Sequence, residues 1–148
     1  MSKKTINIKS LKETKQFAES FAKEILDKPK CRSLVLALEG ELGAGKTTFT
    51  QALGKEFGIN KSILSPTFVI SKRFPLKNKP FKNLYHIDVY RVGYEIGDMG
   101  LKDFMSEPNL LVIEWADKIR DILPKDTVWI KFEHGKEGTE RKITINRR

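Results

Sequence analysis

The sequence predicts an α/β fold, in which helices flank a central, partly parallel (mixed) sheet. Two apolar runs, Ser33–Leu38 and Leu110–Ile113, lack polar alternation, as is typical of strands buried on both faces of a parallel sheet. A glycine-rich turn and a helical pattern follow the first run directly, which is the order of elements in such sheets. The chain has 148 residues and no repeat or linker, so residues 1–148 are expected to form one domain.

The composition excludes disordered and membrane-spanning classes. Hydrophobic residues make up 39% and charged residues 32% of the chain, which is typical of a folded, water-soluble domain. The apolar runs are far shorter than the roughly 20 residues of a membrane helix. The first residues do not resemble a signal peptide, and the single cysteine, Cys31, cannot form an internal disulfide. We therefore expect a cytoplasmic location and no membrane contact.

The charge of the chain favours a polyanionic partner. Lysine and arginine total 28 and aspartate and glutamate 19, which gives a net charge of +9. An excess of this size favours binding to nucleic acid or to nucleotide phosphates.

The first elements are expected to be a short strand and an amphipathic helix. Residues 5–8 alternate between polar and apolar, which indicates a half-buried strand. Ser10 and Glu13 have the spacing of a capping box, so a helix should begin beside them. Apolar residues then recur every four positions as far as about Leu26.

The middle of the chain predicts a second helix and two further strands. A helical pattern covers about residues 46–57, and Gly58 fits the position just after its end. Residues 67–74 and 84–92 are expected to be strands, and residues 93–105 to be irregular with a short helix.

The last third predicts a helix and a hairpin. A helix is expected at about residues 117–123, after the second buried strand. Val128, Ile130 and Phe132 alternate with Trp129 and its polar neighbours, so one face of this strand should meet the core. Residues 140–145 could pair back with it across a glycine-containing turn.

Residues Gly40–Thr47 match the phosphate-loop pattern G-x-x-x-x-G-K-[ST] in full. Glycines allow a tight backbone turn that aims N–H groups at phosphate oxygens, and the next helix adds its positive N-terminus. Lys46, expected in an exposed loop, would reach the β- and γ-phosphates, and the Thr47 hydroxyl would bind Mg²⁺. The domain is therefore predicted to be P-loop NTPase-like. The predicted nucleotide-binding residues of this segment are Gly40, Glu41, Leu42, Gly43, Ala44, Gly45, Lys46, Thr47 and Thr48. Glu41, Leu42 and Ala44 are expected only to shape the loop.

The reaction class follows less directly from the residues. Ala116-Asp117-Lys118 is the nearest match to the guanine-reading motif N/T-K-x-D, and it lacks the asparagine. The signature L-S-G-G-Q of ABC transporters does not occur, and a chain of this size has little room for a kinase lid. ATP with Mg²⁺ is favoured by elimination.

Two carboxylates compete for the role of the second metal-side acid. Glu114 ends the apolar run Leu110–Ile113, where the usual residue is aspartate, and Asp88 ends the segment Tyr85–Ile87. Either could hold Mg²⁺ or its water, and either could be a surface carboxylate.

Four segments together resemble a known family. They are Glu39–Phe49 (E-G-E-L-G-A-G-K-T-T-F), Ser65–Phe68 (S-P-T-F), His86–Arg91 (H-I-D-V-Y-R) and Ile113–Trp115 (I-E-W). In this order they resemble the TsaE (YjeE) family, small bacterial ATPases of the tRNA threonylcarbamoyladenosine pathway. The resemblance runs from about residue 11 to residue 145. Ala116 stands where family members often carry proline.

The resemblance implies slow ATP hydrolysis within a complex with the proteins TsaD and TsaB. That complex installs threonylcarbamoyl on adenosine 37 of tRNAs that read ANN codons; TsaD performs the acyl transfer, and tRNA could be contacted in the complex. The resemblance supports the roles of Lys46 and Thr47. It further implies that Thr67 lies in a switch-like loop, Asp88 handles the attacking water, Glu114 binds Mg²⁺ and Trp115 lies at the nucleotide.

Two other functions stay open on the sequence alone. A small-molecule or nucleoside kinase would use the same phosphate loop but transfer phosphate to an acceptor. A nucleic-acid-binding module could keep the nucleotide site for structure only. Among the remaining polar residues, His86 is expected to make a structural hydrogen bond.

Overall fold

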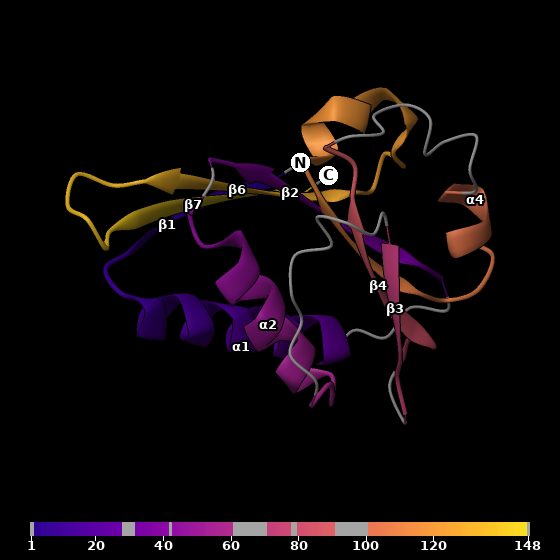
Figure 1. The fold of residues 1–148 in the computed structure, drawn as a ribbon. Coiled ribbons are helices and arrows are strands. Elements are labelled where there is room, and N and C mark those ends of the chain that lie inside the picture. The colour runs from indigo at the N-terminus through magenta and orange to yellow at the C-terminus, as the bar shows by residue number, and fades with distance from the viewer. Residues whose placement is uncertain are drawn as a thin grey trace.

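The computed structural model describes residues 2–27, 32–41, 43–60, 71–77, 80–90 and 101–147 (Figure 1). The strands of this part of the chain are β1 (Ser2–Ile8), β2 (Leu34–Gly40), β3 (Ser71–Pro75), β4 (Asn83–Asp88), β5 (Leu110–Glu114), β6 (Val128–His134) and β7 (Arg141–Arg147). The helices are α1 (Leu11–Asp27), α2 (Lys46–Glu56), α4 (Leu101–Phe104) and the 3₁₀ helix η1 (Ala116–Ile122). None of these helices is both long and apolar enough to cross a membrane.

The strands form one mixed sheet in the order β1-β7-β6-β2-β5-β4-β3. The four central strands are parallel: β2 pairs with β5 and β6, and β4 pairs with β5. The edges are antiparallel, with β3 on β4 at one side and β6, β7 and β1 at the other. The predicted α/β fold with a partly parallel sheet is therefore confirmed.

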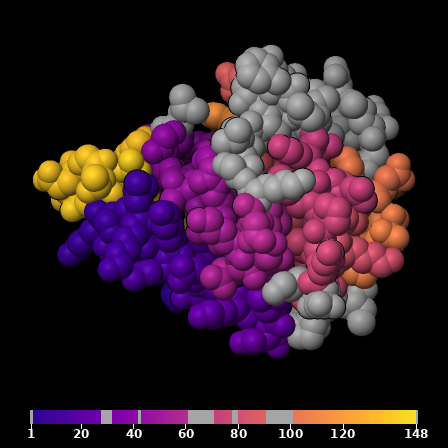
Figure 2. Space-filling view, turned by 60° about the horizontal axis from the view of Figure 1, so that its bottom comes forward, coloured from indigo at the N-terminus to yellow at the C-terminus, as the bar shows by residue number. Residues whose placement is uncertain are grey.

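The sheet separates two apolar layers. Side chains on one face of the central strands, such as Leu36 and Val112, pack with α1 and α2, while those on the other face, such as Ala37 and Ile113, pack with α4 and η1. All four of these side chains are fully buried, as expected from the apolar runs; burying one leucine- or isoleucine-sized side chain contributes about 1.5–3 kcal/mol. Figure 2 shows α1 and α2 side by side on the first face.

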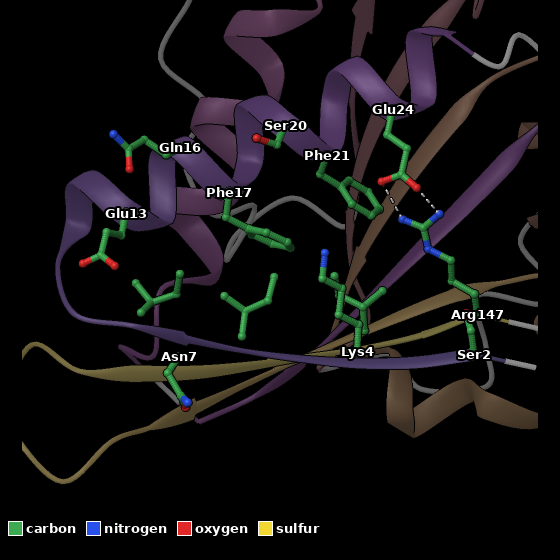
Figure 3. Close-up of a pocket in the computed structure, with 13 residues that line it drawn as sticks. Ser2, Lys4, Asn7, Glu13, Gln16, Phe17, Ser20, Phe21, Glu24 and Arg147 are labelled. Carbon is green, nitrogen blue, oxygen red and sulfur yellow. Dashed lines mark hydrogen bonds and ion pairs between the residues drawn. The ribbon is translucent and has the colours of Figure 1, made fainter.

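Helix α1 begins at the predicted capping box. The Ser10 Oγ accepts a hydrogen bond from the Glu13 N–H at 3.2 Å, and the Glu13 carboxylate accepts one from the Lys9 N–H at 3.3 Å. In Figure 3, Phe17 and Phe21 point into a pocket of about 580 Å³ between α1 and β1. The same two rings contact Phe49 of α2, with centroids 5.5 and 6.0 Å apart.

Three expected elements differ in detail. The strand predicted at residues 84–92 ends at Asp88, because the Asp88 carboxylate accepts a hydrogen bond from the Tyr90 N–H at 2.8 Å and turns the chain. The helix predicted at residues 117–123 is a 3₁₀ helix, whose three-residue period places Ala116 and Ile119 together on the core. For the strand predicted at residues 67–74, the described part is β3, and the earlier residues lie outside the described ones.

The C-terminal hairpin follows the predicted alternation. Ile130 and Phe132 are buried on the α1 side of the sheet. Trp129 lies on the opposite face and is partly covered by the Arg120 guanidinium, 3.9 Å from the ring centroid.

Gly40 should be much less replaceable than a glycine with similar backbone geometry elsewhere. It ends β2 with φ of +139°, and a Cβ at this position would overlap the backbone oxygen of Phe132. Gly58 also has positive φ, +86°, but a Cβ there meets nothing within 4 Å. We expect Gly58→Ala to cost about 1–2 kcal/mol in backbone strain. Gly40→Ala should cost about 1–3 kcal/mol more from overpacking.

Urea unfolding of the two variants measures this difference. Equal free energies of unfolding for Gly40→Ala and Gly58→Ala would contradict the close approach of β2 to β6.

Candidate nucleotide site

The loop between β2 and α2 has the backbone of an anion cradle. Gly40, Gly43 and Gly45 all have positive φ, at +139°, +76° and +107°, a region that residues with a side chain rarely adopt. Gly45 directly precedes α2, and no side chain among the described residues caps that helix. The N–H groups of the first turn are therefore open to an anion in front of the helix. Leu42 lies outside the described residues.

A pocket of about 440 Å³ lies over this loop. Its wall combines the loop with the start of α1, the end of β5 and the hairpin between β6 and β7. The lining residues are Ser10, Leu11, Thr14, Gly43, Gly45, Lys46, Thr47, Thr48, Glu114, Trp115, Thr139 and Arg141. Segments near both ends of the described chain thus contribute to the candidate site. The sequence did not indicate this, because Ser10 was predicted only as a helix cap and no motif marks Thr139 or Arg141.

The hairpin is tied to the loop and to the start of α1. Arg141 donates a hydrogen bond to the Gly43 carbonyl at 3.3 Å, and the Thr139 hydroxyl donates one to the Lys9 carbonyl at 3.0 Å. In Figure 2 the hairpin (yellow) lies beside the N-terminal part of the chain (indigo). Arg141 therefore places a positive charge at the rim of a pocket suited to phosphate.

Lys46 is buried, so the expectation that it lies in an exposed loop is wrong. It is the first residue of α2 and is only 5% exposed. Its Nζ donates a hydrogen bond to the Gly40 carbonyl at 3.0 Å and lies 4.1 Å from the centroid of the Trp115 ring. Burial lowers the pKa of Lys46, and the nearby charges of Glu114 and Asp88 partly oppose this shift. The side chain folds back over the loop because its ammonium is held there by a carbonyl and an aromatic face.

The two candidate carboxylates lie at the same edge of the sheet. Asp88 and Glu114 are register partners at the ends of the parallel strands β4 and β5. Glu114 is 4% exposed and lines the pocket, and its Oε2 lies 2.5 Å from Nε2 of His86. Asp88 is partly buried and does not line the pocket, whereas its register partner Glu114 does. Burial raises the pKa of Asp88, with Glu114 adding to the shift, while the Tyr90 N–H, His86 and Lys46 oppose it.

Trp115 links the phosphate loop to the end of β4. Its backbone has φ of +61°, and its ring contacts both Lys46 and Tyr90, with the ring centroid of Tyr90 4.9 Å away. The side chain lines the pocket over the phosphate loop. Thr67 and Arg91 lie outside the described residues.

The residues of the pocket fit a magnesium–nucleotide complex. The hydroxyl of Thr47 and the carboxylate of Glu114 supply hard oxygen ligands, and Mg²⁺ commonly takes one or two protein oxygens together with phosphates and water. Lys46 and the glycine backbone are suited to the phosphate charge. Within the described part of the chain, no three or more histidine, cysteine, aspartate or glutamate side chains are grouped to hold a metal ion.

Comparison with known proteins identifies relatives along nearly the whole chain. The family model "Threonylcarbamoyl adenosine biosynthesis protein TsaE" matches residues 8–143. The tRNA threonylcarbamoyladenosine biosynthesis protein TsaE of Bacillus subtilis is 36% identical over 142 residues, which cover 96% of this chain and 82% of that protein. The protein of the same name from Rickettsia prowazekii is 40% identical over 129 residues, covering 85% and 83%. The crystal structure of YdiB from Bacillus subtilis superposes with a TM-score of 0.78 at 29% identity, and covers 99% of this chain and 86% of its own.

The raised pKa of Asp88 predicts that its carboxylate lowers the stability of the fold in a pH-dependent way. The folded chain binds this proton more tightly than the unfolded chain, so the stability that the group contributes is full at low pH and is lost as the pH rises through the folded pKa. At pH 7 the ionised Asp88 carboxylate therefore lowers the free energy of unfolding. We expect Asp88→Asn to melt at a higher temperature than the wild type at pH 7 without nucleotide or Mg²⁺. The difference should shrink as the pH falls through the raised folded pKa, and it should have disappeared once the pH is below the usual value of 3.8.

Thermal melting of both proteins across this pH range provides the measurement. A difference in melting temperature that is the same at every pH would contradict the assigned cause, since an uncharged effect does not titrate.

Proposed function

We propose that this chain, which belongs to the TsaE family of tRNA threonylcarbamoyladenosine biosynthesis proteins, is an ATP-binding and slowly hydrolysing subunit of that pathway. It would act with TsaD and TsaB in forming the threonylcarbamoyl group on adenosine 37 of tRNAs that read ANN codons. A cytoplasmic location goes with this proposal.

The observation that carries the ATPase proposal is the convergence of Lys46, Asp88 and Glu114 at the phosphate loop. The three side chains come from α2, β4 and β5, and they are close enough for the two carboxylates to affect the pKa of the lysine. Phosphoryl transfer requires charge neutralisation and an oriented nucleophile rather than covalent chemistry by the protein. A buried cation with two carboxylates beside an anion cradle meets these requirements.

Each residue of the site has a separate role in this proposal. The loop N–H groups and Lys46 bind the β- and γ-phosphates. The Thr47 hydroxyl and the Glu114 carboxylate would hold Mg²⁺, which would supply neutralisation of phosphate charge. Asp88, which stays beside the pocket and partly accessible, orients the attacking water. Trp115 packs against Lys46 and keeps bulk water from that side of the ammonium.

The chain alone is expected to be a weak ATPase. The pocket is open at its rim, and the described residues next to it supply one further cation, Arg141, that lies on the hairpin rather than over the carboxylates. Efficient hydrolysis needs exclusion of water and further neutralisation of the γ-phosphate. TsaD and TsaB are the proposed source of this closure.

Phosphate release from ATP and from GTP, with and without TsaB, TsaD and tRNA, tests the proposal. We expect slow release from ATP alone and faster release in the complete mixture. Transfer of the phosphate to a small-molecule acceptor would favour a kinase instead. Tight RNA binding without any nucleotide dependence would favour a nucleic-acid-binding module.

Lys46→Met should abolish hydrolysis without unfolding the chain. Methionine keeps most of the buried stem and its contact with Trp115, and it removes a buried charge whose pKa is already lowered by burial. It cannot neutralise the transferring phosphoryl group, so we expect at least about a 100-fold loss of turnover. Phosphate release and circular dichroism on the same preparation provide the measurement. Wild-type turnover in a folded variant would rule out this loop as the site.

Substitutions of the two carboxylates should impair different steps. Glu114→Gln should weaken Mg²⁺-dependent nucleotide binding together with turnover, because it removes a charged metal ligand. Asp88→Asn should lower turnover while nucleotide and Mg²⁺ still bind, because the residue acts on water. Binding and single-turnover assays with both variants separate these effects. The reverse pattern would exchange the two roles.

A further inference from the structure

His86 is the buried partner of Glu114 and lies behind the pocket. It is fully buried on β4, and its Nε2 lies 2.5 Å from Oε2 of Glu114. The pocket is lined by Glu114 and not by His86. The other ring nitrogen, Nδ1, is buried and has no hydrogen-bond partner among the residues that the structure describes. Among the described residues, the imidazole therefore makes its polar contact with the carboxylate that faces the pocket.

The proposed metal role of Glu114 sets the direction of this hydrogen bond. A carboxylate that binds Mg²⁺ is ionised and only accepts, so Nε2 of His86 would donate to Oε2. The bond occupies one oxygen of Glu114 and leaves Oε1 for the pocket.

The strand register places His86 within reach of the Glu114 side chain. His86 lies two residues before Asp88 on β4 and therefore on the same face of the sheet, and it is the register partner of Val112 on β5. Glu114 stands two residues after Val112, also on that face. Its side chain must lean back along the sheet to meet the imidazole, and this fixes the rotamer of a long, otherwise flexible acid.

We infer that His86 is a positioning residue for the magnesium site: its Nε2–H holds the Glu114 carboxylate so that Oε1 faces Thr47 and the phosphates. The inference rests on the proposed function, because it takes Glu114 as a Mg²⁺ ligand. Hydrogen bonds to carboxylate ligands orient them, and losing such a partner typically costs about 10–100-fold in metal affinity. His86 itself touches neither nucleotide nor metal.

The test is the Mg²⁺ concentration that gives half-maximal binding of a fluorescent ADP, the N-methylanthraniloyl derivative. In His86→Leu this concentration should rise about 10–100-fold, while binding of the same nucleotide in excess chelator stays as in the wild type. His86→Gln, whose amide nitrogen can reach the position of Nε2, should recover most of the loss. His86→Asn, which is too short to reach Glu114, should not.

A matched control separates positioning from general loss of stability. Asn109 is also a buried polar residue, 2% exposed, but it lies at the opposite end of β5 and bonds to Asn83. Asn109→Leu should lower the melting temperature and leave the Mg²⁺ dependence unchanged. If His86→Leu does not fold, the comparison of Gln with Asn at position 86 decides the question, and equal Mg²⁺ dependence in those two variants overturns the inference.

Two further outcomes are distinct. In the first, His86→Leu shows the Mg²⁺ dependence of the wild type while Glu114→Gln needs a higher Mg²⁺ concentration for nucleotide binding. This result overturns the role of His86 and leaves the proposed function intact. Nucleotide binding by the wild type that does not respond to Mg²⁺ overturns the proposed metal site itself and this inference with it.

Discussion

The parallel pairing of β2, β5 and β4 is the constraint on which the site depends. Parallel strands end at the same edge of a sheet, so the register that pairs Leu38 with Glu114, and Glu114 with Asp88, brings three separate segments to one place. The same arrangement aims α2 back over that edge, with Lys46 at its first position. An acid displaced by one residue along β4 or β5 would point to the other face of the sheet.

The clustering of these charged groups lowers the stability of the chain when no ligand is bound. A lysine and a glutamate that are nearly buried lie near a partly buried aspartate, and burial disfavours the charged forms of Lys46 and Asp88. Two of these groups, Asp88 and Glu114, are placed by the ends of the buried central strands β4 and β5, and Lys46 by the start of α2. A ligand that brings negative phosphates and a divalent cation would replace the missing solvation of both signs of charge. Stability and function therefore place opposite demands on the same few side chains.

Local patterns in the sequence predicted most of the elements. These elements depend on interactions between residues that are close in the sequence. They are the apolar runs of β2 and β5, the four-residue period of α1 with its Ser10 cap, and the glycine-rich loop. The structure has them where expected. The antiparallel edges and the order of strands depend on pairing between distant segments, which no local pattern encodes. The burial of Lys46 could not be read from its motif, because it arises from Trp115, some seventy residues later. The expected hydrogen bond of His86 is present, but its partner was identified only once β4 and β5 were placed side by side.

The contribution of both chain ends to the pocket has a consequence for biosynthesis. Strand β1 pairs with β7, the last strand, and Lys9 is joined to Thr139 in the hairpin. A ribosome releases the N-terminal part of a chain first, so the loop and α2 emerge well before Arg141 can complete the wall of the pocket. During translation the nascent chain thus holds a phosphate loop without its enclosing hairpin. A nucleotide bound as proposed would meet the full pocket wall only after residues 139–141 have left the ribosome, so ligand binding would stabilise chains that contain this hairpin.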